Sequence, residues 1–194
     1  MEKNRISAEE INQLPLKSWE GKTKVITNPD SIPHIAEEIK KHKVIGFDTE
    51  SKPAFKKGEY NPVALLQIAI PGKVYLIRVS ETGFDAALAD IFSSPGITKV
   101  GVAINDDVKE LQKFHDFDPA NIYDLASLAE KKGILNGGVR GLTGLLLGFR
   151  ISKRQQTSNW ENKKLSSAQI DYAATDAWVC LEIYGRLKKI KDLS

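Results

Sequence analysis

Residues 44–50, with the sequence VIGFDTE, place two carboxylates inside a run that otherwise has the composition of a buried β-strand. Successive side chains of a strand point to opposite faces, so Asp48 and Glu50 share one face. Ionised carboxylates are costly to bury unless positive charge compensates them, so this face is a candidate site for a divalent cation. The alternative is a strand that ends in solvent, where acidic residues are common.

The composition excludes several other classes of protein. The 194 residues suit one domain with a full hydrophobic core, and the hydrophobic and charged fractions of 41% and 27% are those of a soluble globular protein. No apolar run reaches the about 20 residues that a membrane helix needs. The first residues lack the apolar core of a signal peptide and Cys180 is the only cysteine, so we expect a cytoplasmic protein without membrane attachment.

Hydrophobic periodicity and turn residues predict a mixed α/β domain. Strands are predicted over residues 24–27, 44–50, 64–70, 73–79, 99–104 and 122–124, with a hairpin turn at Pro71-Gly72. Helices are predicted over residues 32–41, 84–92, 108–114, 126–132, 142–147 and 166–184. Residues 1–22 are polar and weakly periodic, so we divide the chain into an N-terminal arm, 1–22, and a single domain, 23–194.

Two more acidic residues follow elements that could bring them to the first pair. Asp107 stands where the strand 99–104 meets a helix, and its neighbour Asp106 is expected to cap that helix. Asp176 lies four residues after Tyr172 in the last helix, so the two share a helix face. Carboxylate oxygens suit Mg²⁺ or Mn²⁺, whereas none of the three histidines has the spacing of a zinc site. The alternative for an isolated Tyr/Asp pair on a helix is a solvated or hydrogen-bonded pair without a catalytic role.

These residues resemble the motifs of the Asp-Glu-Asp-Asp 3′-5′ exonucleases, in the DEDDy subtype whose third motif contains a tyrosine. Residues 47–50 (FDTE) are similar to the first motif, 101–107 (GVAINDD) to the second and 172–176 (YAATD) to the third. Within the family the resemblance is greatest to the Werner-syndrome exonuclease domain and next to ribonuclease D. It implies a ribonuclease-H-like α/β fold, with a mixed five-stranded sheet flanked by helices on both faces.

The resemblance also implies an enzyme that hydrolyses phosphodiester bonds at nucleic-acid 3′ ends with two divalent cations, Mg²⁺ or Mn²⁺, and releases nucleoside 5′-monophosphates. By analogy the four carboxylates of Asp48, Glu50, Asp107 and Asp176 hold the ions and form the catalytic site with Tyr172. Asp48 bridges both ions, Glu50 and Asp176 complete the site of the water-activating ion, and Asp107 helps more indirectly. Tyr172 is expected to orient the attacking water with Glu50, because a phenol with a pKa of about 10 is a poor base at neutral pH. The alternative is a non-catalytic nucleic-acid-binding module on the same fold.

The expected substrate is a single-stranded or recessed 3′ end of DNA or RNA, with DNA favoured. Six residues are candidate substrate contacts: Lys52, Phe55, Lys56, Arg150, Arg154 and Trp160. The basic ones would bind phosphates. Members like the Werner-syndrome domain commonly carry an aromatic residue after the first-motif glutamate, where this chain has Ser51-Lys52, so Phe55 could replace it. Trp160 could stack on a base or pack in the turn before the last helix. The chain has no helicase or polymerase motifs, so a helicase, polymerase or repair partner would be a separate polypeptide.

Overall fold

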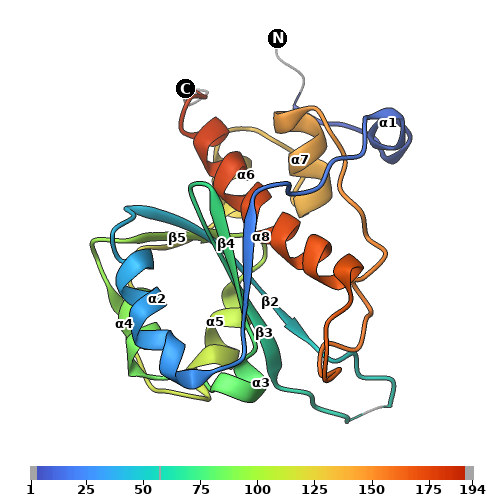
Figure 1. The fold of residues 1–194 in the computed structure, drawn as a ribbon. Helices are drawn as coiled ribbons and strands as arrows, with labels where there is room; N and C mark the ends of the chain where they lie inside the picture. The colour runs from blue at the N-terminus through green and yellow to red at the C-terminus, as the bar shows by residue number, and fades with distance from the viewer. Residues whose placement is uncertain (1–3, 57, 191–194) are drawn as a thin grey trace.

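A mixed β-sheet forms the centre of the computed structural model, which describes residues 4–56 and 58–190 (Figure 1). The ends of the predicted arm and domain, residues 1–3 and 191–194, lie outside the described residues. The six strands are β1 (Lys22–Ile26), β2 (Val44–Ser51), β3 (Val63–Ile70), β4 (Lys73–Ile77), β5 (Thr98–Gly101) and β6 (Ile122–Asp124). They lie in the order β1-β4-β3-β2-β5-β6. β3 is antiparallel to β2 and β4, and the other neighbouring pairs are parallel.

The predicted α/β class with a mixed, helix-flanked sheet is confirmed, although the sheet has six strands where the family resemblance implies five. The outermost strands, β1 and β6, are short and pair on one side only within the described residues. All eight residues of the central β3 are buried, because helices cover both faces of the sheet there. The predicted hairpin turn is confirmed at Gly72, whose φ of +79° favours glycine.

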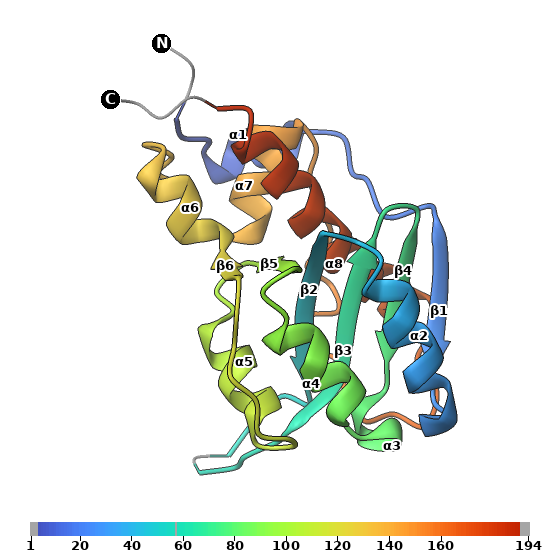
Figure 2. The ribbon, with the colours of Figure 1, turned by 90° about the vertical axis from the view of Figure 1, so that its left-hand side faces the viewer.

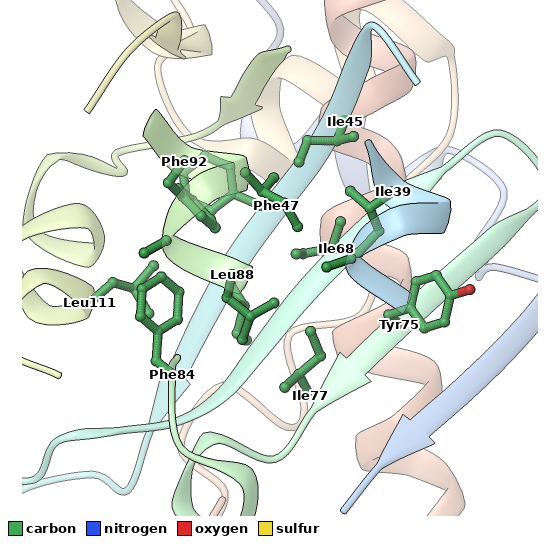
Figure 3. Close-up of a cluster of buried hydrophobic side chains, with 14 of the residues drawn as sticks. Ile39, Ile45, Phe47, Ile68, Tyr75, Ile77, Phe84, Leu88, Phe92 and Leu111 are labelled. Carbon is green, nitrogen blue, oxygen red and sulfur yellow. The ribbon is translucent and has the colours of Figure 1, made fainter. Parts of the chain in front are cut away.

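Helices α2 (Ile32–Ile39), α4 (Ala86–Ser93) and α5 (Asn105–Gln112) cover one face of the sheet (Figure 2). The short 3₁₀ helix η1 (Pro29–Ser31) precedes α2, and α3 (Val79–Thr82) follows β4. The core beneath these helices is apolar, as the close-up of its side chains shows (Figure 3). The rings of Phe47 and Phe92 meet edge to face at 5.1 Å between centroids, a favoured aromatic geometry. This core fixes the face of β2 that points away from Asp48 and Glu50.

The opposite face of the sheet carries one long helix, α8 (Ser167–Leu187). It begins at the predicted capping box, in which Ser166 and Gln169 each accept a hydrogen bond from the other's backbone N–H. Small residues of α8 pack on β3 and β4 in a core of their own. The C-terminal half of α8 packs with α6 (Leu125–Lys131) and α7 (Val139–Leu147), and α1 (Ala8–Gln13) lies against α7. One helix therefore joins the sheet to the α6/α7 layer.

Gly46 allows α8 to approach β2 closely. A Cβ atom built on Gly46 would lie 2.3 Å from the carbonyl oxygen of Ala177 and 3.0 Å from the backbone nitrogen of Leu181. Real Cβ contacts are not this short, so any side chain at this position would push the helix away. Gly46 lies on the same face of β2 as Asp48, and the close contact therefore sets the distance from that strand to the acidic face of α8.

Three sequence predictions near strand and helix ends are wrong. Asp106 does not cap α5, because the helix begins at Asn105 and the cap position is occupied by Ile104, which makes no side-chain cap. Asp106 is exposed instead and its carboxylate lies 2.9 Å from Lys109 Nζ. The predicted strand 73–79 ends at Ile77, where the chain turns into α3, and the predicted strand 99–104 ends before Ala103, whose φ is +60°.

The described part of the predicted arm crosses from α1 past α7 and α8 to β1 (Figure 1). α1 begins with a capping box between Ser7 and Glu10, and Leu16 forms an isolated parallel bridge with Arg150. The division into an arm, 1–22, and one domain, 23–194, stays a prediction. Among the described helices, none combines the length and the apolar character required to cross a membrane.

Candidate active site

Strand β2 and helix α8 bring three carboxylates together. Asp48, Glu50 and Asp176 each offer one oxygen, and these three oxygens lie within 4.8 Å of one another. Asp48 and Glu50 point to the same face of β2, as strand alternation predicts, and α8 brings Asp176 onto that face. The two aspartates are separated by more than a hundred residues of sequence, so the fold creates this cluster.

Asp176 is 5% exposed, and its Oδ1 atom is buried with no hydrogen-bond partner among the described residues. A buried carboxylate oxygen without a donor is unfavourable, and two neighbouring carboxylates add like-charge repulsion. A cation between the three residues would satisfy this oxygen and neutralise the repulsion. Hard oxygen ligands of this kind match a divalent cation such as Mg²⁺ or Mn²⁺, so the residues present fit a metal site.

Burial raises the pKa values of all three carboxyl groups, and like-charge repulsion adds to the rise for Asp48 and Glu50. Burial, together with the negative charges of Asp176 and Asp107, raises the pKa of Asp48. Burial and then the neighbouring acids raise the pKa of Glu50 to about 10, and burial raises the pKa of Asp176 to about 7. Without a cation Glu50 therefore holds a proton at neutral pH and Asp176 is partly protonated, and a cation would displace these protons when it binds.

Asp107 lies outside the three-carboxylate group, on the first turn of α5. The hydroxyl of Thr49 donates a hydrogen bond to Asp107 Oδ1, and Thr49 points to the face of β2 opposite to Asp48 and Glu50. Burial raises the pKa of Asp107, and this hydrogen bond partly offsets the rise. The negative charge of Asp107 also raises the pKa values of Asp48 and Glu50, so Asp107 influences the cluster electrostatically although it is not part of the three-carboxylate group.

Tyr172 lies on α8 one turn before Asp176, as the sequence spacing predicts, and its ring centroid is 6.0 Å from that of Trp160. Burial, followed by the charges of Asp176 and Glu50, raises the pKa of the Tyr172 phenol further above its ordinary value. The hydroxyl is therefore neutral at physiological pH and can donate a hydrogen bond, whereas it cannot act as a base there.

The candidate substrate contacts lie in different places. Arg154 lines a groove that also contains Tyr172 and Asp176. Phe55 is 82% exposed in the loop after β2, next to the exposed Lys56. Lys52 Nζ lies 3.7 Å from the carboxylate of Glu161. These positions leave the substrate roles of the four residues as predictions.

The other two candidate substrate contacts, Arg150 and Trp160, interact with other parts of the protein. Arg150 Nε donates a hydrogen bond of 3.0 Å to the carbonyl oxygen of Leu14 in the arm. Trp160 is 0% exposed and packs in the core between the sheet and α8, which matches the packing alternative and leaves no exposed ring face for a base. The Trp160 ring lies next to that of Tyr172 and packs with small residues of α8 rather than toward solvent.

Sequence reasoning passed over Gln67. It is the direct neighbour of Asp48 in the β2/β3 pairing, is 0% exposed, and neither atom of its side-chain amide has a hydrogen-bond partner among the described residues. The signal in the sequence was the single polar residue in the otherwise apolar strand VALLQIAI. Thr49 was passed over as well, and only the position of α5 shows its contact with Asp107.

The sequence of this chain is similar to those of known 3′-5′ exonucleases. A sequence model described as 3′-5′ exonuclease matches residues 23–192. The human exonuclease mut-7 homolog is 30% identical over 89% of this chain, an Arabidopsis thaliana 3′-5′ exonuclease is 32% identical over 76%, and the mouse bifunctional 3′-5′ exonuclease/ATP-dependent helicase WRN is 32% identical over 77%. The chain spans 22%, 54% and 11% of the lengths of these three relatives, respectively.

Solved structures of other proteins have the same fold as this chain. The Aedes aegypti Nibbler EXO domain superposes with a TM-score of 0.81 at 27% identity, and the match covers 89% of this chain and 91% of that one. Escherichia coli RNase D has the same fold, with a TM-score of 0.77 at 24% identity over 86% of this chain and 44% of that one. The chain therefore belongs to the 3′-5′ exonuclease family, as its Asp-Glu-Asp-Asp motifs predict.

Proposed function

We propose that this protein is a metal-dependent 3′-5′ exonuclease that hydrolyses the terminal phosphodiester bond at nucleic-acid 3′ ends and releases nucleoside 5′-monophosphates. The observation that carries the proposal is the convergence of Asp48, Glu50 and Asp176 oxygens within 4.8 Å of one another, with Tyr172 one helical turn away. Family membership gives the reaction class, and this cluster supplies the groups that such a reaction requires.

Asp48, Glu50 and Asp176 would hold two divalent cations, Mg²⁺ or Mn²⁺. When bound, such cations lower the pKa of a water molecule and stabilise the charge on the leaving 3′ oxygen. The neutral hydroxyl of Tyr172 orients the attacking water together with Glu50, because positioning needs a donor but no titration near pH 7. Asp107 supports the cluster through its charge and through its hydrogen bond with Thr49.

The proposed substrate is a single-stranded or recessed 3′ end. We favour DNA over RNA on the likeness to the Werner-type domain. RNA is the other substrate to be compared, because the structurally similar Escherichia coli RNase D is named as an exoribonuclease. A separate helicase, polymerase or repair protein is a proposed partner, since the WRN relative carries exonuclease and helicase activity in one longer chain.

The test is incubation of matched single-stranded and recessed DNA oligonucleotides, and an RNA of the same sequence, with Mg²⁺, Mn²⁺ or a chelator. We expect stepwise shortening from the 3′ end only in the presence of metal, with nucleoside 5′-monophosphates identified by mass spectrometry. Faster shortening of RNA would reverse the substrate preference. Binding of the oligonucleotides without shortening of any of them would instead support the non-catalytic module.

A further inference from the structure

Two grooves reach Tyr172 and Asp176, and the N-terminal arm contributes to the walls of both. The first, here called the arm groove, has a volume of about 320 Å³ and lies between Leu16, Lys17 and Ser18 of the arm and residues Ser152 and Arg154. The second, of about 450 Å³, includes Ile6, Ala8 and Ile11 of the arm. All of these arm residues precede the part of the chain that the family model matches.

The arm is fixed to the protein along its length. Lys17 N–H donates to the carbonyl oxygen of Arg150 at 3.0 Å, and Arg150 N–H donates to that of Pro15 at 2.9 Å. Trp19 N–H donates to Thr175 Oγ1 on α8 at 2.9 Å, and the rings of Trp19 and Trp178 lie 5.6 Å apart. The arm therefore forms a rigid wall beside the third-motif helix.

At its other end the arm is anchored in the same way. Ile6 exchanges two hydrogen bonds with the side-chain amide of Asn136, at 2.9 and 3.1 Å. Ile6 and Ile11 are buried, with Ile11 facing α7 close to Gly144. Burial of two isoleucines stabilises the arm by several kcal/mol, at about 1.5–3 kcal/mol for each side chain.

The chemistry of the arm groove suits a nucleic-acid strand. Lys17 and Arg154 stand on its two sides, and among the described residues no acidic oxygen lies within 4 Å of the charged nitrogens of either. Leu16 is 54% exposed beside Lys17, an apolar surface against which a base or sugar can pack. Asp171 and Asp176 line the side formed by α8, so phosphates are drawn to the two basic rims.

We propose that the arm groove binds the sugar-phosphate backbone of a single strand next to the 3′-terminal nucleotide, with Lys17 and Arg154 contacting phosphates and Leu16 contacting a sugar or base. The inference rests on the proposed function, since it takes Tyr172 and Asp176 as the reacting end of the groove. It gives the arm a specific role as a substrate-binding element that precedes the residues matched by the family model.

The test is binding of a labelled single-stranded oligonucleotide to the whole chain at low salt with a chelator, measured by fluorescence anisotropy. Lys17→Glu and Arg154→Glu are each expected to weaken binding on the order of tenfold, because each places a negative charge where a phosphate lies. Lys22→Glu is the matched control: it makes the same charge change five residues away on exposed β1, and it is expected to bind within about twofold of the parent. Thermal unfolding of each variant verifies the fold.

The outcomes separate the two proposals. A parent that binds no oligonucleotide, or a Lys17→Glu variant that binds as tightly as the parent, overturns the arm groove even if metal-dependent shortening is observed. Equal weakening by Lys17→Glu and Lys22→Glu also overturns it, because the effect would then be one of net charge. Selective weakening by Lys17→Glu with no metal-dependent shortening supports the arm groove and overturns the exonuclease proposal.

Discussion

The backbones of β2 and α8 meet at Gly46 and Ala177, where an added Cβ on the glycine would lie 2.3 Å from the alanine carbonyl oxygen. Gly46 stands two residues before Asp48 and Ala177 one residue after Asp176. The spacing of the carboxylates therefore depends on a contact that only glycine permits.

Gly46→Ala is expected to destabilise the protein by about 1–3 kcal/mol, the usual cost of overpacking a core, and to reduce metal-dependent cleavage beyond what the lost stability explains. Chemical denaturation and cleavage rates measured well below the melting temperature check the two effects. Gly185→Ala is the control. Gly185 lies inside α8 with open space around its Cβ position, so alanine there should stabilise by about 0.5–1 kcal/mol. A Gly46→Ala variant as stable as the parent would contradict the contact.

Asp176→Asn should lower the rate of metal-dependent cleavage by more than about a hundredfold, since the neutral amide is a poor cation ligand. The metal-free fold should persist, because the substitution removes a buried acid that is already unfavourable when ionised. Addition of Mg²⁺ should raise the melting temperature of the parent and have a smaller effect on the variant. Glu182→Gln, an exposed change on the same helix, is the control and should cleave like the parent.

Tyr172→Phe keeps the ring that packs against Trp160 and removes only the hydroxyl. The cleavage rate should fall by about a hundredfold, the typical effect of a misplaced reactant, while the Mg²⁺-induced rise in melting temperature stays that of the parent. Parallel measurement of rate and melting temperature separates the two roles. Loss of the Mg²⁺ response would show that the hydroxyl supports metal binding instead.

The metal-free protein should become less stable as the pH rises. In the folded state the pKa of Asp176 is raised to about 7 and that of Glu50 to about 10, above the ordinary values of 3.8 and 4.5. At a pH between the ordinary and the raised pKa of each group, the folded protein holds a proton that the unfolded chain has lost. The free energy of unfolding therefore falls as the pH rises from about 4 toward about 7 for Asp176 and toward about 10 for Glu50. The lowered pKa of Glu38, at about 2, acts in the opposite sense and only at lower pH.

Thermal unfolding in a chelator at about pH 5 and about pH 8 tests this dependence, and each kcal/mol lost should lower the melting temperature by about 2–4 °C. Mg²⁺ should reduce the difference, because it binds the deprotonated carboxylates and so stabilises the high-pH form. Asp176→Asn should have a flatter profile than the parent. A melting temperature that rises between these two pH values would contradict the raised pKa values.

The sequence predicted those features of the site that depend on local periodicity. Strand alternation placed Asp48 and Glu50 on one face, and the capping box at Ser166 located the start of α8 and hence the face shared by Tyr172 and Asp176. The roles assigned to these residues stay predictions for the experiments above.

Features that depend on contacts between distant segments could not be predicted in this way. Whether Trp160 faces a substrate or the core is decided by its packing against α8, which no local pattern encodes. The partner of Asp107 depends on how α5 lies over Thr49. The position of the arm depends on the bridge between Leu16 and Arg150, two residues far apart in a chain whose first 22 residues are mostly polar.

Because α8 packs against the sheet with one half and against α6 and α7 with the other, it cannot open without exposing two cores. The backbone amides around Asp176 should therefore be among the slowest in the molecule to exchange with deuterium, and their exchange should require nearly global unfolding. Active-site segments in many enzymes are drawn from the least stable parts of the fold. In this protein, the acidic cluster is instead expected to include a residue from one of the last elements to unfold.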